Sequence, residues 1–410
     1  MKTPKTSKYN YYFQFLMFLS LLIFTMLFNN NNFCYDEPYY YNNVVLLNKF
    51  GLTNQFLRSM HSHAGPLHGV ILWILQIITH GNVQLVRMVN LILLFAIIQF
   101  AKLIYNKINT NHPIKNSLEL GIMSIPMIYV CSGLALTEIP ALFFLTFSMY
   151  LLQISNLEKI DYRWIIAGIF MSFAILGRQP YLLIAPIFII YFYLTSKSEI
   201  KFLNTCLFAL FTLALPIYVF YVWKGLVPPF ITKNFTSKEN FNILYIILGL
   251  GYSFLLALLI DRKFILPLNK FKYFLLFLLI LTFAICYSLH FNYFILKSLI
   301  DKFIPLSYSD FLGAINSSIL IILGVWYLAS LLFQIYLNRY DNNKLILLIP
   351  ILFIIISCGK ITHQFSSRYI FQAGIFFVLI QSSNKKDNIQ ILLRVVGGLI
   401  GFISLLSYIF

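Results

Sequence analysis

The sequence has few charged residues and no long polar stretch. Only 10% of its 410 residues are charged and 60% are hydrophobic, whereas about a quarter of the residues in a soluble domain are charged. No polar stretch reaches the roughly 100 residues of a typical globular domain. These shortages exclude a water-soluble protein, and residues 1–410 are predicted to form a single transmembrane domain.

Paired cysteines and acidic residues are also scarce. The five cysteines show no CxxC pair and no disulfide-framework spacing, so they are interpreted as residues of membrane packing. Only 13 Asp and Glu residues oppose 30 Lys and Arg residues, which gives a net charge of +17. A nucleic-acid binder would also be basic, but Lys and Arg on cytoplasmic loops of a membrane protein explain the excess. No nucleic-acid partner is predicted.

Apolar runs of membrane-spanning length recur along the whole chain. They predict an all-α, polytopic membrane protein with about 12–13 transmembrane helices. Lys2, Lys5 and Lys8 precede the first run, and we expect that run to be an uncleaved helix because no small-residue cleavage site follows it. The predicted spans are 10–31, 83–105, 117–133, 138–154, 163–177, 180–195, 202–223, 241–260, 273–290, 315–337, 344–358, 368–382 and 391–409.

The charge distribution predicts the orientation of these spans. With the N-terminus in the cytoplasm, most Lys and Arg residues fall on short cytoplasmic loops, as the positive-inside rule requires. The long segments 33–82, 224–240, 291–314 and 359–367 then face outward. In the first of these loops, residues 66–79 are apolar but too short to span, so we expect an amphipathic helix half-immersed along the membrane surface. Function is therefore expected on the extracytoplasmic face.

Few acidic residues fall on that outer face. They are Asp36, Glu37, Glu138, Glu239, Asp301 and Asp310. Asp36 and Glu37 are adjacent, open the first outer loop and are flanked by aromatic residues, where desolvation would raise a carboxylate pKa toward the range of a general base. The pair is the predicted catalytic group, although a surface carboxylate is more often only a solvated charge.

Two outward corners carry basic side chains. Arg178 and Gln179 precede Pro180, which separates two helices with almost no loop. Arg368 follows a second polar cluster that includes His363. A guanidinium held at the membrane edge can grip phosphate through two hydrogen bonds, although it can also extend to lipid headgroups. We therefore expect Arg178, Gln179, His363 and Arg368 to bind a phosphate.

The first outer loop also contains His61, His63 and His68, which raises the question of a metal. Their spacing matches no standard ligand signature, so no metal site is predicted. Asp36, Glu138, His61 and His63 are the residues that would hold a divalent cation if one is needed. Glu138 opens a helix, where a carboxylate can also serve only to cap the helix dipole.

An outward carboxylate beside arginines at the lipid boundary suits glycosyl transfer from a polyprenyl-phosphate sugar. The leaving phosphate needs neutralising charge rather than a proton donor, and one carboxylate can act as base toward the acceptor hydroxyl. Glycoside hydrolysis ordinarily needs two paired carboxyl groups. The residues present therefore favour a transferase over a hydrolase.

Several motifs in collinear order resemble the GT-C superfamily of membrane glycosyltransferases. They are the Asp-Glu pair after the first helix, Gly-Pro-Leu (65–67), Leu-Thr-Glu-Ile-Pro (136–140), Gly-Arg-Gln-Pro (177–180), Trp-Lys-Gly-Leu-Val-Pro-Pro (223–229) and Ser-Arg-Tyr (367–369). Two branches are similar: the bacterial protein-mannosyl and aminoarabinose transferase-like group, and the dolichyl-phosphate-glucose α-1,2-glucosyltransferases. Leu85–Phe95 and Arg178–Gln179 resemble the second branch.

The resemblance implies a GT-C fold and an inverting hexosyltransferase that uses a polyprenyl-phosphate sugar. It also implies that the acidic pair supplies the base, with Asp36 preferred, that Glu138 positions the acceptor or a metal, and that Arg178 and Arg368 hold the donor phosphate. The acceptor, which can be a lipid-linked glycan, a polysaccharide or a protein, stays open.

Two other functions stay open beside the transferase: a transporter or flippase, and a polymerase or ligase of the O-antigen type. A transporter usually carries ionisable residues near the bilayer midplane, whereas here nearly every charge is expected at a helix end. A polymerase or ligase is expected to carry its key residues in a large late loop. The favoured location is a bacterial inner membrane, with the endoplasmic reticulum membrane as the alternative.

Overall fold

The computed structural model describes residues 6–27, 32–108, 118–155, 159–195, 198–235, 241–267, 272–288, 306–361, 365–380 and 388–409. Within these ranges every regular element is a helix. The helices are α1 (Thr6–Leu27), α2 (Glu37–Phe50), α3 (Asn54–Ser59), α4 (Leu67–Thr79), α5 (Val83–Ile108), α6 (Leu118–Met123), α7 (Pro126–Gly133), α8 (Glu138–Ile154), α9 (Tyr162–Gly177), α10 (Tyr181–Leu194), α11 (Glu199–Trp223), α12 (Pro229–Phe235), α13 (Ile243–Asp261), η1 (Arg262–Phe264), α14 (Lys272–Ser288), α16 (Leu306–Leu337), α17 (Asn342–Ser357), η3 (Cys358–Lys360), η4 (Ser367–Tyr369), η5 (Phe371–Ala373), α18 (Gly374–Ile380) and α19 (Asn388–Ile409).

This architecture confirms the prediction of an all-α, polytopic membrane protein. Helices suit a bilayer because each satisfies its own backbone hydrogen bonds where no water is available. In the described part of the chain, six helices are long and apolar enough to cross a membrane, or up to seven if the bent pair α7–α8 is one span. The other predicted spans coincide with shorter apolar helices such as α9 and α10. A dozen crossings are therefore reached only if these shorter helices also cross.

The predicted span 117–133 is broken in the structure. The helix ends at Met123, and Pro126 begins α7 as one of its first residues. Proline suits a helix start because it lacks the N–H that would be unpaired there. The next break, between α7 and α8, bends the chain by 109°. Glu138 opens α8 directly after this second bend.

Helices pack closely where glycines face a neighbouring backbone. A Cβ atom at Gly251 of α13 would lie 2.4 Å from the carbonyl oxygen of Leu320 in α16, and one at Gly324 of α16 would lie 3.0 Å from the carbonyl oxygen of Ile247 in α13. Small residues of this kind let membrane helices approach each other. One large buried apolar cluster includes Phe18 of α1 and Leu405 of α19. The prediction that residues 1–410 form a single domain stays a prediction.

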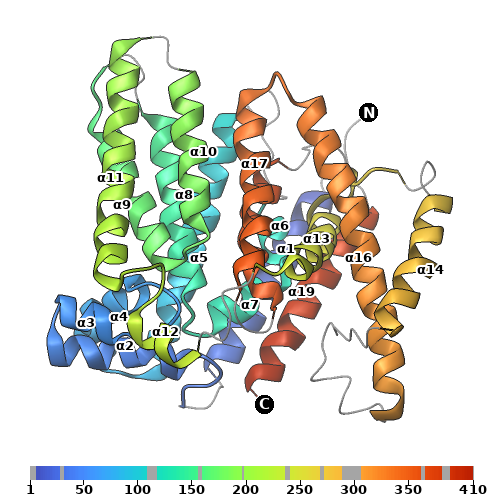
Figure 1. Cartoon of the computed structure of the whole chain (residues 1–410), viewed down its shortest axis with the longest axis horizontal. Coiled ribbons are helices and arrows are strands. Elements are labelled where there is room, and N and C mark those ends of the chain that lie inside the picture. The colour runs from blue at the N-terminus through green and yellow to red at the C-terminus, as the bar shows by residue number, and fades with distance from the viewer. Residues whose placement is uncertain are drawn as a thin grey trace.

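The first outer loop forms a helical layer across one end of the bundle. Figure 1 shows α2, α3 and α4, together with α12, at the lower ends of α8, α9 and α11. Asn48 joins the layer, because its side chain accepts a hydrogen bond from Trp73 Nε1 (2.9 Å) and donates one to Gln76 Oε1 (3.0 Å). On α4, the side chains of Ile74, Ile77 and Ile78 remain exposed. This apolar face fits the predicted helix at the membrane surface.

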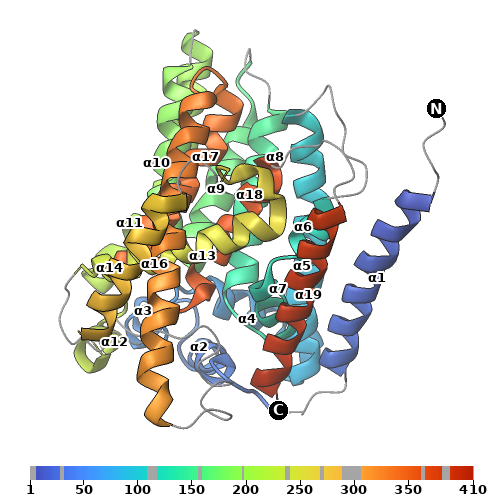
Figure 2. The same cartoon turned by 90° about the vertical axis from the view of Figure 1, so that its right-hand side faces the viewer.

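The course of the chain fits the predicted sidedness. In Figure 2, α1 and α19 both run downward, and α19 ends at the lower end of the molecule, where the layer of α2, α3 and α12 also lies. The described parts of segments 33–82 and 224–240, both predicted to face outward, therefore lie at one end. The structure thus brings together loops that are hundreds of residues apart in the sequence.

Candidate functional site

Four charged residues from four parts of the chain meet under the helical layer. Asp36 precedes α2, Glu138 opens α8, Arg178 lies between α9 and α10, and Arg368 lies in η4. We call these four residues the acid–arginine cluster. Glu138, Arg178 and Arg368 are buried, whereas the Asp36 side chain is 36% exposed. The cluster therefore has a buried interior and one carboxylate at its edge.

Arg368 is the centre of the acid–arginine cluster. Its Nη1 atom lies 2.7 Å from Asp36 Oδ2, and its Nε atom lies 2.7 Å from Glu138 Oε1. Its Nη2 atom donates to the hydroxyl oxygen of Tyr40 at 2.9 Å, and its guanidinium carbon lies 5.5 Å from the ring centroid of Tyr35. Arg368 thus holds two carboxylates at once, through separate N–H groups of its planar guanidinium.

Arg178 completes the cluster but is incompletely hydrogen-bonded. Its Nη2 atom lies 3.2 Å from Glu138 Oε1, and its guanidinium carbon lies 5.5 Å from the ring centroid of Tyr369. Its buried Nε and Nη2 atoms have no partner with hydrogen-bond geometry among the described residues. A buried donor without an acceptor costs roughly 1–3 kcal/mol, and more when it is charged. Arg178 can therefore accept an additional anionic ligand.

The neighbouring carboxylate, Glu37, belongs to a different unit. Its Oε1 and Oε2 atoms accept from Arg87 Nε and Nη2 at 2.8 and 2.6 Å. The same two oxygens also accept the backbone N–H groups of Ala135 (2.7 Å) and Cys34 (2.8 Å). Both charged side chains are 0% exposed. Glu37 has no oxygen left for a substrate, so Asp36 is the member of the acidic pair that is placed to act as a base.

The Gln179 side chain forms hydrogen bonds with two loops rather than with the arginines of the acid–arginine cluster. Its Nε2 atom donates to the backbone oxygen of His63 and, at 3.4 Å, to that of Leu226. The side chain thus connects the first outer loop with the loop before α12. We expected Gln179 to bind phosphate, and that role stays a prediction, whereas its contacts describe a residue that holds two loops together.

The two histidines named as possible ligands of a divalent cation, His61 and His63, lie in different surroundings. The His61 ring stacks on Phe230, with ring centroids 4.0 Å apart, and burial lowers the pKa of His63. In the described ranges, no group of three or more His, Cys, Asp or Glu side chains is placed to hold a metal ion. His363, expected to bind phosphate, lies outside the described residues.

His68 is buried beside the acid–arginine cluster. Its side chain is 2% exposed, and neither ring nitrogen has a hydrogen-bond partner among the described residues. Its ring packs against the edge of Tyr40 at 5.9 Å between centroids. Burial lowers the pKa of His68 to about 4 against the attraction of Glu138 and Glu37, while burial raises the pKa of Tyr40. Both side chains are therefore neutral at pH 7.

Several residues of the site were not predicted. Arg87 and Asn90 lie within an apolar run, and the sequence does not show which partners these two side chains meet. Tyr40 and Tyr369 belong to aromatic surroundings that we interpreted only as a membrane interface. A charged residue inside a membrane helix is by itself a sign of function or of a buried partner, and this rule alone could have singled out Arg87.

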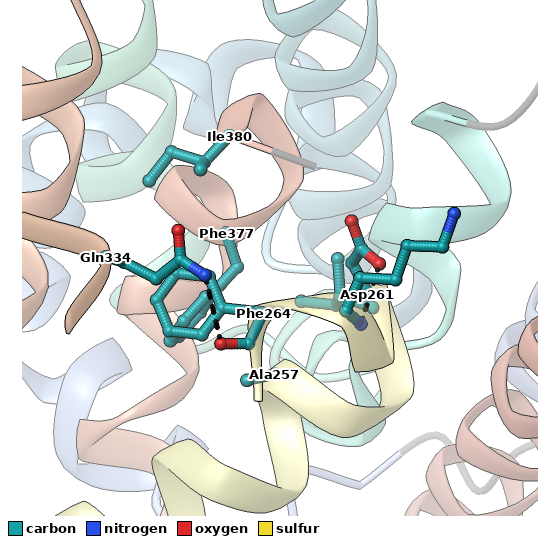
Figure 3. A pocket seen from close by; sticks show the side chains of 8 residues that line it. Ala257, Asp261, Phe264, Gln334, Phe377 and Ile380 are labelled. Atoms are coloured by element: carbon teal, nitrogen blue, oxygen red, sulfur yellow. Dashed lines mark hydrogen bonds between the residues drawn. The ribbon is translucent and has the colours of Figure 1, made fainter. Parts of the chain in front are cut away.

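A separate small cavity lies at the C-terminal end of α13. Its volume is about 100 Å³, and its lining includes Asp261, Phe264, Gln334 and Phe377. Figure 3 shows Gln334 directed at the backbone oxygen of Phe264, at a donor–acceptor distance of 3.4 Å. The cavity contains no residue of the acid–arginine cluster, whose η4 segment follows η3 at the opposite end of α13, where Asn242 donates to Gly359. The candidate site is therefore the cluster and not this cavity.

Among solved structures, the chain is similar to two crystal structures of ArnT from Cupriavidus metallidurans. The structure bound to undecaprenyl phosphate is 10% identical, with a TM-score of 0.40 over 94% of this chain and 77% of that chain. The structure in the apo state is 10% identical, with a TM-score of 0.41 over 96% of this chain and 78% of that chain. No protein-family model matches this chain, and no curated protein matches it.

Proposed function

We propose that this multi-pass membrane protein is an inverting glycosyltransferase. It moves a hexose or a related sugar from a polyprenyl-phosphate donor to an acceptor hydroxyl on the extracytoplasmic face of the membrane. The acceptor is a lipid-linked glycan, a polysaccharide or a protein. The observation that carries the proposal is the acid–arginine cluster, in which a half-open carboxylate lies beside two buried guanidinium groups at one end of an apolar helical bundle.

The cluster offers the groups that a single displacement needs. A sugar carried on phosphate leaves with negative charge on the phosphate oxygens, and fixed positive donors stabilise that charge in a dry site. The attacking hydroxyl needs a base, which Asp36 supplies at the exposed edge of the cluster. One displacement with one base inverts the anomeric carbon. A hydrolase would instead present two carboxyl groups flanking the bond.

Each residue of the cluster has a distinct part in this proposal. Arg178 has buried N–H groups that find no hydrogen-bond partner in the described part of the chain, and it binds the donor phosphate. Arg368 binds the phosphate as well and holds the Asp36 side chain in place through its 2.7 Å contact. Glu138, which is 0% exposed, faces both arginines and holds their guanidinium groups against each other's repulsion. The polyprenyl chain of the donor lies in the bilayer, along the apolar outer faces of the helices.

The compartment follows from the same proposal. A polyprenyl-phosphate donor on an outward face fits a bacterial inner membrane, and the endoplasmic reticulum membrane is the alternative. No metal is required for the chemistry, because two guanidinium groups stand where a divalent cation would otherwise neutralise phosphate. Addition of EDTA to the assay tests this, and a lost activity that Mg²⁺ or Mn²⁺ restores would assign the cation a part.

The decisive experiment measures transfer from radiolabelled polyprenyl-phosphate sugars in membranes that contain the protein. We expect wild-type protein to transfer the sugar and Asp36→Asn to reduce kcat by about 10²–10⁴-fold, the usual contribution of a general base. The matched control is Asp341→Asn, because the Asp341 side chain is similarly exposed (42%) and also contacts a basic residue, Lys344.

Two results would contradict the proposal in different ways. Asp36→Asn with a wild-type rate would remove Asp36 as the base. Transfer that depends on a nucleotide sugar, and not on the lipid-linked donor, would overturn the donor class.

A further inference from the structure

The helix α5 carries two buried polar residues, of which Arg87 binds the first outer loop and Asn90 binds the bend between α7 and α8. Arg87 is 0% exposed and Asn90 is 1% exposed. They are three residues apart, so they share one face of the helix. Neither belongs to the acid–arginine cluster, and the proposed chemistry uses neither. Burying a charged or polar side chain costs free energy unless the side chain is hydrogen-bonded. The groups that Arg87 and Asn90 bind must therefore offset this cost.

Asn90 binds the bend between α7 and α8. Its Nδ2 atom lies within hydrogen-bond distance of the backbone oxygens of Cys131 (3.1 Å), Leu134 (2.9 Å) and Leu136 (2.8 Å). Three carbonyl oxygens around one atom fix the orientation of the amide, because the opposite orientation would place oxygen against oxygen. Asn90 therefore caps the C-terminal end of α7, where helix carbonyls lack partners within the helix.

The pair formed by Arg87 and Glu37 binds the same bend from the other side. Glu37 accepts the N–H of Ala135 at 2.7 Å while Arg87 holds both of its carboxylate oxygens. Between them, Asn90 and Glu37 thus bind the backbone of residues 134–136 through carbonyl and N–H groups alike. The chain cannot shift at this bend without breaking several buried hydrogen bonds.

Both carboxylates of the cluster are attached to this unit. Asp36 is the neighbour of Glu37 in the sequence, and Glu138 begins α8 three residues after Ala135. Arg368 spans the gap between them with two contacts of 2.7 Å each. The distance between Asp36 and Glu138 is therefore set by the α5 side chains behind them, and not by Arg368 alone.

We infer that Arg87 and Asn90 are positioning residues, which through Glu37 and the 131–137 bend hold Asp36 and Glu138 at the spacing that transfer requires. The inference rests on the proposed function of the cluster. Neither side chain touches the reacting atoms. A shift of about 1 Å in a catalytic group costs about 100-fold in rate, so loosening the bend reduces the chemical step more than the binding of the donor.

The test compares Asn90→Ala with a matched variant, Asn204→Ala. Asn204 is equally buried (0% exposed) and also binds loop backbone, since it donates to Lys159 O at 2.9 Å and accepts from Asp161 N at 3.4 Å. We expect Asn90→Ala to lower kcat about 100-fold with the donor KM changed by less than about threefold. We expect Asn204→Ala to keep kcat within about twofold, even though its thermal stability falls by about as much as that of Asn90→Ala.

Graded variants keep the test decisive. Asn90→Ser retains one donor and restores part of kcat. Arg87→Lys retains the charge but loses the two-point contact with Glu37, and it serves if Asn90→Ala does not fold. Equal losses of kcat in the Asn90 and Asn204 variants, or a loss confined to the donor KM, would overturn the inference and leave the proposed function standing.

A second measurement does not depend on activity. Hydrogen–deuterium exchange of the purified protein in detergent reports on segment 131–137 directly. We expect Asn90→Ala to speed exchange there by about tenfold or more and to leave residues 159–161 unchanged, with the reverse in Asn204→Ala. Unchanged exchange in 131–137 would refute the positioning role. If the wild-type protein transfers no sugar at all, the proposed function fails while this measurement still decides what Asn90 holds.

Discussion

Asp36 and Glu37 are neighbours in the chain, yet they belong to two opposite kinds of ion pair. Glu37 forms a closed pair with Arg87, in which both side chains are 0% exposed and both carboxylate oxygens accept further backbone hydrogen bonds. Asp36 joins an open cluster, in which its own side chain is 36% exposed and buried N–H groups of Arg178 have no hydrogen-bond partner among the described residues. A satisfied pair holds structure, and an unsatisfied one can hold a ligand.

The largest effect is expected from breaking the closed pair. Arg87→Leu leaves the Glu37 carboxylate buried without its counter-ion, which costs about 3–5 kcal/mol of stability. Thermal unfolding followed by size-exclusion chromatography in detergent measures the loss. Asp36→Asn is the comparison, because Asp36 can meet water, and we expect about 1 kcal/mol or less. Equal losses in the two variants would abolish the distinction between closed pair and open cluster.

His68 extends the comparison, because it lies close to both the Glu37–Arg87 pair and the acid–arginine cluster and has no hydrogen bond to either. Its folded-state pKa of about 4 lies below the ordinary value of 6.5, so the unfolded chain binds more protons between these two values. Stability therefore falls as pH decreases from 6.5 to 4 and levels off below. At 1.36 kcal/mol per pKa unit the contribution reaches roughly 3 kcal/mol.

The variant His68→Phe should remove this part of the pH dependence. Melting temperatures recorded from pH 4 to pH 7 give the measurement. His80→Asn is the control, because His80 is exposed and its left-handed backbone (φ 46°) suits asparagine. If the melting temperatures of the wild type and of His68→Phe change with pH by the same amount over this range, the expectation is refuted.

A smaller effect is expected from removing one of the two arginines of the acid–arginine cluster. Arg178→Ala removes charged donors worth about 1.5–3 kcal/mol to a bound phosphate, which corresponds to a weaker affinity for polyprenyl phosphate by about 10–150-fold. Titration of undecaprenyl phosphate against intrinsic fluorescence reports the affinity. Arg178→Lys recovers part of it, since lysine keeps the charge but not the fork. Full affinity in Arg178→Ala would place the phosphate elsewhere.

The smallest effect concerns the loops that cover the cluster. Gln179→Ala removes the hydrogen bonds to His63 and Leu226, each worth about 1 kcal/mol. Faster limited proteolysis within 224–228, with the melting temperature nearly unchanged, is the expected result. Asn54→Ala is a suitable control, because its hydrogen bond with Tyr218 at 2.6 Å is exposed.

The sequence predicts the helices well, because they depend on local composition, and the outward orientation stays a prediction. Runs of apolar residues locate spans, and the charges of short loops orient them. The same local signals place Asp36, Glu138, Arg178 and Arg368 on one face. They do not say that Arg368 lies between the two carboxylates, because its contacts join residues more than 200 positions apart and depend on how the helices pack.

The different contacts of Asp36 and Glu37 depend on where α2 begins. Asp36 precedes α2 as its N-cap residue, and Glu37 is the first residue inside it. Successive helical residues point about 100° apart, so one carboxylate turns toward α5 and the other toward η4. The sequence does not show to within one residue where this helix begins, which is why it left the choice between them open.

The acid–arginine cluster has two negative and two positive side chains, so it carries no net charge. A neutral cluster exerts little attraction on a distant anion, and the Debye screening of about 8 Å at physiological ionic strength shortens that reach further. A lipid-borne phosphate then arrives by lateral diffusion in the bilayer, without electrostatic guidance. The rate of its capture should accordingly be nearly independent of salt, while its residence time depends on the two arginines.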